Sequence, residues 1–185
     1  MDSKGALAIL HRYNSIEEQA NMVGQTTTSD RVPNSLVGVA VGTSGDYLER
    51  AYACYEAGAD IICIDVAHGH HSLMKEALKQ LRLMVSDDVH IMAGNVATLE
   101  AYDDLCDWGA DSVRCNIGGG SICSTRIQTG HGVPGLQTIF DCAKSKNAGS
   151  IPIIADGGIR NSGDIVKALA AGADFVMLGS LLAGT

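Results

Sequence analysis

Short apolar runs alternate along the whole chain with segments of helical periodicity. The apolar runs are four to six residues long and nearly continuous, rather than strictly alternating apolar and polar. Continuous apolar runs of this length are typical of parallel strands that are covered on both faces. The seven predicted strands are residues 6–10, 36–41, 61–66, 90–93, 112–117, 151–155 and 175–178.

The segments between these runs carry readable helix ends. Ser15 and Glu18 have the spacing of a capping box, in which each side chain bonds the backbone N–H of the other residue. Three helical patterns stop at Gly58, Gly109 and Gly172, and glycine suits the left-handed position that follows a helix. The predicted helices are residues 16–23, 47–57, 72–85, 99–108, 136–145 and 165–171.

The tripeptide Gly-Ala-Asp recurs at 58–60, 109–111 and 172–174, each time between a predicted helix and a predicted strand. The spacings are too long and uneven for a solenoid repeat, and they fit the repeated joint of a (β/α) barrel. A doubly wound sheet is the competing fold, but no G-x-G-x-x-G follows the first strand. We therefore predict an α/β fold, a (β/α)8 TIM barrel that is incomplete because only seven strands are found.

Composition excludes several classes of function. A net charge of −8 without a basic block argues against binding to nucleic acid or to anionic membranes. No apolar run approaches the ~20 residues that span a bilayer. Five cysteines lie within apolar segments and are expected to be reduced core residues, which makes the cytoplasm the default compartment; they are Cys54, Cys63, Cys106, Cys115 and Cys142.

Glycine and polar residues gather where the predicted strands end, which is the edge that carries the site in barrel enzymes. Gly157-Gly158 and Gly179-Ser180 follow the last two strands and can offer backbone N–H groups to an anion. They can also be simple tight turns, but together with Ser121 they favour a phosphate pocket. Asp156 either holds a pair of sugar hydroxyls or caps the following helix.

The segment 116–126 carries the candidate nucleophile. Its three consecutive glycines allow close approach of backbone to a ligand, and Cys123 follows with Arg126 nearby. Fixed positive charge beside a cysteine favours the thiolate, which is the nucleophilic form. The alternative is a glycine-rich turn that carries a buried cysteine.

Two further features of the predicted strand ends concern charge. Arg114 lies inside an apolar strand and should be paired, with Asp65 or Asp156 in reach. The histidines that follow the third strand, at positions 68, 70 and 71, lack a carboxylate at ligand spacing and are interpreted as loop residues. Among them His68 is the candidate for a ligand contact.

Several segments together resemble the IMP dehydrogenase/GMP reductase family, and the resemblance covers essentially the whole chain. They are residues 65–69, 93–96, 118–126, 156–160 with 162–164, and 176–180 with 183–185. The resemblance implies a (β/α)8 barrel, usually tetrameric, that moves a hydride between NAD or NADPH and a purine nucleotide. Residues 1–185 would be one partial catalytic domain without the regulatory pair of cystathionine-β-synthase-type modules.

The resemblance leaves the activity open. Reduction of GMP to IMP and ammonia with NADPH is favoured, because there is no room for the regulatory modules between 23 and 36. Oxidation of IMP to XMP with NAD is the alternative, and a non-catalytic nucleotide-binding remnant is a further one.

The resemblance also implies roles for single residues. Cys123 would attack carbon 2 of the purine, and Thr125 would help to activate water or ammonia. Nucleotide binding would involve Ser121, Asp156, Gly157, Gly158, Gly179 and Ser180, with Asp156 on the ribose. The cofactor side would involve Asp65, Ala67, His68, Asn95 and Arg114. Backbone carbonyls would bind a monovalent cation, usually potassium, at Gly118, Gly120 and Cys123.

The glycine-rich loop departs from the family pattern Gly-Ile-Gly-Pro-Gly-Ser at two positions. Asn116 replaces the first glycine and Gly119 replaces the proline. A loop without the proline is expected to be less pre-organised. Ser124 stands where threonine is common, which is a mild change.

The family's first strand, last helix, mobile flap and acidic segment have no counterpart in residues 1–185. An open barrel exposes two strand edges and apolar surface. We therefore expect the isolated chain to be unstable, to aggregate or to need a partner. Thermal unfolding followed together with light scattering checks this expectation, and a monomer with a sharp cooperative transition would contradict it.

Overall fold

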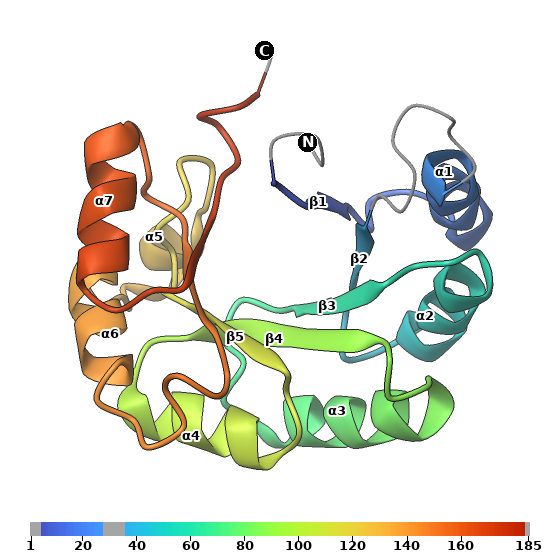
Figure 1. Ribbon diagram of the computed structural model, residues 1–185, viewed down its shortest axis with the longest axis horizontal. Coiled ribbons are helices and arrows are strands. Elements are labelled where there is room, and N and C mark those ends of the chain that lie inside the picture. The colour runs from blue at the N-terminus through green and yellow to red at the C-terminus, as the bar shows by residue number, and fades with distance from the viewer. Residues whose placement is uncertain (1–4, 28–35, 184–185) are drawn as a thin grey trace. The chain divides into compact units, whose positions relative to one another are not determined.

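The computed structural model describes residues 5–27 and 36–183, so Gly184 and Thr185 of the last family motif lie outside it. Within these residues strands and helices alternate, except that two helices, α5 and α6, lie between β5 and β6 (Figure 1). The strands are β1 Ala8–Leu10, β2 Val37–Val41, β3 Ile61–Asp65, β4 His90–Val96, β5 Ser112–Cys115, β6 Ile153–Asp156 and β7 Phe175–Met177. The helices are α1 Ile16–Thr27, α2 Tyr47–Glu56, α3 Ser72–Met84, α4 Leu99–Asp107, α5 Thr125–Thr129, α6 Gly135–Cys142 and α7 Ser162–Ala170.

Strands pair in the order of the sequence, from β1 to β7. The pairings of β1 with β2, β2 with β3, β5 with β6 and β6 with β7 are parallel. This arrangement confirms the predicted α/β class, with the seven strands of an incomplete (β/α)8 barrel. The chain divides into two compact units, Met1–Asp65 with Ser72–Met92 and Val66–His71 with Ala93–Thr185.

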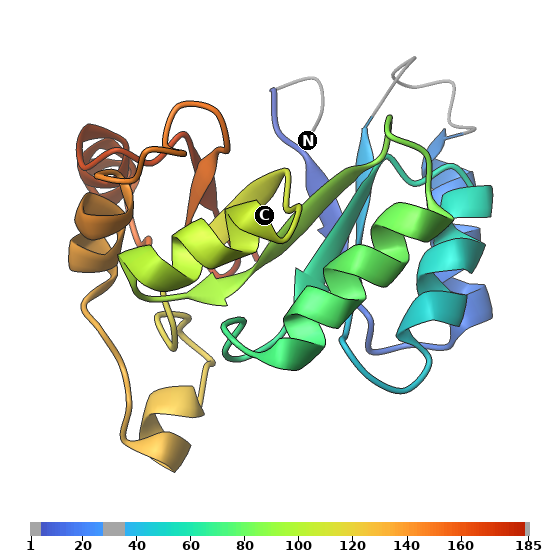
Figure 2. The same cartoon turned by 90° about the horizontal axis from the view of Figure 1, so that it is seen from below.

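The first unit packs helices α1, α2 and α3 in that order along the strands (Figure 2). All five residues of β2 are buried. The predicted capping box is confirmed, since the backbone N–H of Ser15 donates to Glu18 over 2.9 Å and that of Glu18 donates to Ser15 Oγ over 3.1 Å. Behind this helix start the fully buried Gln19 donates to the carbonyl of Ala40 and accepts from Arg50 over 2.8 Å.

The aspartate of the Gly-Ala-Asp repeat ties a strand to its neighbour. In the first unit the backbone N–H of Asp60 donates to the carbonyl of Val37, and the N–H of Val37 donates to Asp60 Oδ2 over 2.8 Å. Asp174 and Ile153 repeat both bonds in the second unit, at 2.9 and 2.8 Å. In these two of its three copies the repeat therefore forms a two-point clamp at the start of a strand.

The second unit has its core between β5 and β6 and helices α4, α6 and α7. All of β5 is buried, and Tyr102 on α4 is fully buried with its hydroxyl donating to the carbonyl of Ile151. Burial raises the pKa of Tyr102 far above its usual value, which keeps the phenol neutral. Thr98 and Asn161 cap α4 and α7, and the side chain of each accepts from the backbone N–H of the third residue of its helix.

Several predicted boundaries need correction. Helix α1 continues to Thr27, beyond the predicted end at 23, and α7 begins at Ser162 rather than 165 because Asn161 caps it there. The short helix α5 was not predicted. The three glycines at the predicted helix ends do adopt positive φ, at +99° for Gly58, +100° for Gly109 and +110° for Gly172.

None of the helices in the described part of the chain combines the length and the apolar character that a membrane span requires.

The strand clamp makes a testable contribution to stability. Asp60→Ala removes the acceptor of the Val37 N–H, which lies on a residue with no exposed surface. We expect the free energy of unfolding to fall by about 1–3 kcal/mol, the cost of an unsatisfied buried donor. Asp87→Ala, at an exposed aspartate in a turn, is the control and should change it by less than about 0.5 kcal/mol. If a urea titration gave the same change in the free energy of unfolding for both variants, the clamp would not contribute more to stability than an exposed aspartate.

Candidate functional site

The site of the second unit is built around Asp156, at the C-terminal end of β6. Its Oδ2 accepts a hydrogen bond from Asn95 Nδ2 over 2.7 Å and an ion-paired bond from Arg114 Nε over 3.2 Å. Arg114, 5% exposed on β5, also donates through Nη2 to the side-chain oxygen of Asn95. Of the two predicted partners of Arg114, Asp156 is thus confirmed as one, and its charge compensates a buried guanidinium.

Asn116 joins the same network from the residue after β5. It is buried, with a positive φ of 108°, a region that asparagine enters more readily than most residues. Its Nδ2 donates to the backbone carbonyl of Asp156 over 2.8 Å, and its own carbonyl accepts from Asn95 over 2.8 Å. The ends of β4, β5 and β6 are therefore held together by side chains.

The glycine-rich loop packs against the turn that follows β6. A Cβ at Gly157 would lie 2.8 Å from the backbone N of Gly120 and 2.9 Å from the carbonyl carbon of Gly119, closer than real Cβ contacts. Gly157 also has a positive φ of +84°, and Gly158 has +78°. Both glycines are required by backbone geometry, so the two loops can approach to backbone contact.

The other predicted phosphate residues emerge near the same edge. In the pairing of β6 with β7, Asp156 stands opposite Met177, so Gly157-Gly158 and Gly179-Ser180 follow neighbouring strand ends. Gly158, Gly179, Ser180 and Ser121 are all exposed. Asp156 does not cap α7, because Asn161 does, and that alternative interpretation is wrong.

Cys123 is exposed and lies beside a hydroxyl. Its Sγ is 3.3 Å from Thr125 Oγ1, and its backbone N–H donates to the carbonyl of Gly120 over 3.1 Å. The hydrogen bonds with Thr125 lower the pKa of the Cys123 thiol, and the charge of Arg126 adds a smaller effect in the same direction. The thiol therefore has more thiolate character than an ordinary cysteine at neutral pH.

Arg126 has a different main role from the predicted one. Its Nε donates to the carbonyl of Ile117 over 3.0 Å, and its Nη2 donates to the carbonyl of Val133 over 2.7 Å and to Asn116 Oδ1 over 3.3 Å. The guanidinium thus holds both ends of the loop that carries Cys123, and only secondarily polarises the thiol.

The remaining cysteines are unsuited to nucleophilic attack. All six are free thiols in the structure, and Cys54, Cys63, Cys115 and Cys142 are buried as predicted, whereas Cys106 is half-buried. Burial raises the pKa of Cys54 and of Cys106 to about 11. Cys123 is therefore the reactive thiol of the described chain.

The predicted cofactor residues are only partly brought together. Asn95 and Arg114 are joined through Asp156, and Ala67 and His68 are exposed on the segment 66–71 of the same unit. Asp65 belongs to the first unit, where its backbone carbonyl accepts from Arg12 over 3.3 Å.

The histidines behave as loop residues. His70 Nε2 lies 2.7 Å from Asp104 Oδ2, and its ring stacks on Trp108 at a centroid distance of 5.9 Å. In the residues that the structure describes, no cluster of histidine, cysteine, aspartate or glutamate side chains has the composition of a metal site.

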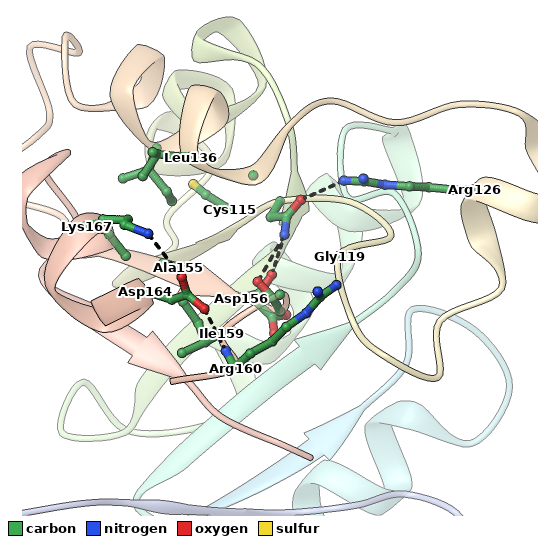
Figure 3. Close-up of a pocket in the computed structure, with 16 residues that line it drawn as sticks. Cys115, Gly119, Arg126, Leu136, Ala155, Asp156, Ile159, Arg160, Asp164 and Lys167 are labelled. Atoms are coloured by element: carbon green, nitrogen blue, oxygen red, sulfur yellow. Dashed lines mark hydrogen bonds and ion pairs between the residues drawn. The ribbon is translucent and has the colours of Figure 1, made fainter. Parts of the chain in front are cut away.

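A cavity of about 280 Å³ lies beside the network, between the ends of β5 and β6 and helices α6 and α7 (Figure 3). Its lining includes Asn116, Gly119 and Arg126, together with Arg160 and Lys167 from the segment that follows β6. Asp164 accepts from the backbone N–H of Arg160 over 3.1 Å and pairs with Lys167 at 3.5 Å. Sequence reasoning found Asn116 only as a departure from a pattern and missed Lys167, which an ordinary helix position gives no reason to single out.

An exposed thiol with a lowered pKa lies in a glycine-rich loop at the C-terminal ends of parallel strands, which is the edge that carries the site in α/β barrel enzymes. The model of the IMP dehydrogenase / GMP reductase domain matches residues 1–185, and the chain belongs to this family.

Relatives of both kinds are similar to the chain. A GMP reductase from Leishmania major is 48% identical over 159 residues, which is 85% of this chain and 32% of the relative. An inosine-5'-monophosphate dehydrogenase from Halalkalibacterium halodurans is 49% identical over 184 residues, which is 100% of this chain and 37% of the relative. The chain spans about a third of the length of the curated relatives it matches.

Solved structures of both enzymes are also similar to the chain. An inosine 5' monophosphate dehydrogenase from Legionella pneumophila has a TM-score of 0.87 at 49% identity, covering 100% of this chain and 53% of that one. A GMP reductase from Trypanosoma brucei in complex with guanosine 5'-monophosphate has a TM-score of 0.76 at 46% identity, covering 84% of this chain and 32% of that one.

The hydrogen bond to Cys123 predicts a pH effect. Thr125→Val keeps the shape of the side chain and removes the hydroxyl, so the pKa of Cys123 should rise. The pH midpoint of its alkylation by iodoacetamide then moves upward, and the rate at pH 7 falls. Ser124→Ala is the matched control, because that hydroxyl makes no helix-capping bond. An unchanged midpoint in Thr125→Val would show that the hydroxyl does not stabilise the thiolate.

Proposed function

We propose that this chain forms part of the catalytic barrel of a purine nucleotide oxidoreductase, which transfers a hydride between NAD(P) and a nucleotide bound at the site around Asp156. The observation that carries the proposal is the exposed Cys123 thiol with a lowered pKa. It sits in a loop packed by backbone contact on the Gly157 turn. The relatives that bear the names of both enzymes support the general reaction.

The nucleotide is held by backbone and carboxylate groups. Ser121, Gly158, Gly179 and Ser180, all exposed, bind the 5′-phosphate. Asp156 binds the ribose hydroxyls. Its Oδ2 already accepts two bonds, but a carboxylate has about four acceptor sites, so capacity remains on a side chain that is 20% exposed.

Chemistry centres on Cys123 and Thr125. In the reductase direction the thiolate of Cys123 would add to carbon 2 of GMP, and the 2-amino group would leave as ammonia. Hydride delivered to carbon 2 would then release the thiolate and give IMP, so the covalent bond splits the reaction into two easier steps. Thr125, 3.3 Å from the sulfur, stabilises the thiolate and is placed to move a proton to or from the incoming or departing water or ammonia. Carbonyls of Gly118, Gly120 and Cys123 would hold a potassium ion. The Gly120 carbonyl accepts one backbone bond and keeps a second lone pair for such an ion.

A nicotinamide cofactor supplies or accepts the hydride when bound. Ala67 and His68 fit this role because they are exposed. The side chains of Asn95 and Arg114 also fit the role of cofactor contacts, because their bonds to Asp156 fix their orientation at the strand ends. Asp65 is proposed as a further cofactor contact because it matches a position of the family motif.

We propose the GMP reductase direction first, with GMP and NADPH giving IMP and ammonia. Its basis is the sequence, in which the segment between α1 and β2 is too short for the regulatory modules. The alternative is IMP dehydrogenase, with IMP and NAD giving XMP. A nucleotide-binding remnant of the family is the third possibility, and it would keep the phosphate groups without turnover.

The proposal is tested with the protein and its Cys123→Ala variant, in folded preparations that light scattering shows to be free of aggregate and with a partner subunit present where the barrel needs one. Each is assayed for NADPH consumption with GMP, for NADH formation with IMP, and for GMP and IMP binding by calorimetry. We expect turnover in one direction, lost at least about a thousandfold in Cys123→Ala because the nucleophile is absent, with nucleotide affinity nearly retained. Cys106→Ala on α4 is the control, since that thiol is half-buried with a raised pKa.

Three outcomes are informative. Turnover of GMP identifies a reductase, and turnover of IMP identifies a dehydrogenase. Nucleotide binding without turnover in either direction would overturn the enzymatic proposal in favour of the remnant.

A further inference from the structure

The two positions at which the glycine-rich loop departs from the family pattern are neighbours in space. Asn116 stands in place of glycine and Gly119 in place of proline. Both line the cavity shown in Figure 3, together with Gly135 at the start of α6.

Both polar atoms of the Asn116 side chain, Nδ2 and Oδ1, make hydrogen bonds. Its Nδ2 donates to the carbonyl of Asp156 over 2.8 Å and, more weakly, to that of Gly157 over 3.4 Å. Its Oδ1 accepts from Arg126 Nη2 over 3.3 Å. One buried amide thus connects the β6 turn to the arginine that holds the Cys123 loop.

The space that this amide occupies exists because two facing residues lack side chains. A Cβ at Gly119 would lie 2.9 Å from Asn116 Cγ and closer still to Nδ2. A Cβ at Gly135 would lie 2.8 Å from Nδ2 and 3.0 Å from Cγ. Proline at 119 would place a ring where the amide lies, so the present rotamer of Asn116 requires glycine there.

Loss of proline and gain of asparagine act in opposite directions on loop order. Glycine in place of proline increases the conformational freedom of the loop in the unliganded and unfolded states. The amide bonds of Asn116 restrain the same segment, because the positive φ of 108° and the two carbonyl acceptors fix its orientation.

We propose that Asn116 is a positioning residue for the Cys123 loop, that its hydrogen bonds replace the restraint a proline would give, and that residues 116 and 119 are energetically coupled. The functional part of this inference rests on the proposed function. The coupling itself does not, and it can be measured without substrate.

The test is a double-mutant cycle of the protein, Asn116→Gly, Gly119→Pro and the double variant, which restores the family's loop. Two quantities are measured: amide hydrogen exchange of residues 117–126 without ligand, and kcat and KM for the nucleotide. Asn116→Gly should raise exchange and KM about tenfold with a smaller change in kcat. Gly119→Pro should do at least as much, because its ring meets the amide.

The double variant decides the matter. We expect exchange and KM to return to within about threefold of the parent protein, a coupling of at least tenfold. Additive effects of the two substitutions would overturn the proposal. If coupled exchange is found in a protein without turnover, the coupling stands and only the proposed function fails.

Two further variants serve as controls. One tests whether the effects arise from misfolding, and the other tests whether the Asn116 side chain acts only by filling space. Gly119→Ala places a Cβ on the same amide with a smaller change in backbone freedom, and its effect on exchange should disappear in the Asn116→Gly background. Asn116→Asp keeps the shape and loses both Nδ2 donors, so it should behave like Asn116→Gly; behaviour like the parent protein would show that only the volume matters.

Discussion

The pairing of Asp156 with Arg114 is the interaction on which the site depends. Arg114 on β5 is only 5% exposed, so its guanidinium requires a compensating charge, which Asp156 at the end of β6 supplies. Removing one partner of a buried pair commonly costs about 3–5 kcal/mol, because the other charge is left uncompensated. Asn95 shares both partners, so the ends of three strands are fixed together.

This rigid centre supports loops that can meet a ligand. The backbone carbonyl of Asp156 receives the amide of Asn116, and the following Gly157 packs on the backbone of the glycine-rich loop. Cys123 lies farther along that loop and is exposed. Buried charge thus sets the positions of strand ends, and exposed hydroxyl, thiol and N–H groups remain available for chemistry.

Much of this fold can be predicted from local sequence patterns. Continuous apolar runs predict parallel strands, and the capping box of Ser15 and Glu18 and the glycines at helix ends adopt the expected geometry. The Gly-Ala-Asp repeat predicts the joints, although its clamp onto the neighbouring strand is visible only in three dimensions. A charged residue inside an apolar strand needs a partner of opposite charge, and this argument identified Asp156 as one of two candidates for pairing with Arg114.

Other features depend on distant residues and leave no local signal. Helix α5 spans five residues without apolar periodicity, and no pattern marks it. The bonds of Arg126 to carbonyls on both sides of the loop, and the filling of the space at Gly119 by Asn116, follow from tertiary packing. The effect of the missing proline on loop order therefore stays a prediction, because Asn116 and Arg126 also restrain the loop.

The central claim is that Cys123 bonds covalently to a purine nucleotide. The most direct measurement is mass spectrometry with peptide mapping after a rapid denaturing quench of the protein mixed with GMP and NADPH, or with IMP and NAD. We predict a nucleotide adduct on the peptide that contains Cys123 and on no other cysteine peptide. Turnover with the adduct on another residue, or undiminished turnover by a protein whose Cys123 is replaced by alanine, would contradict the account.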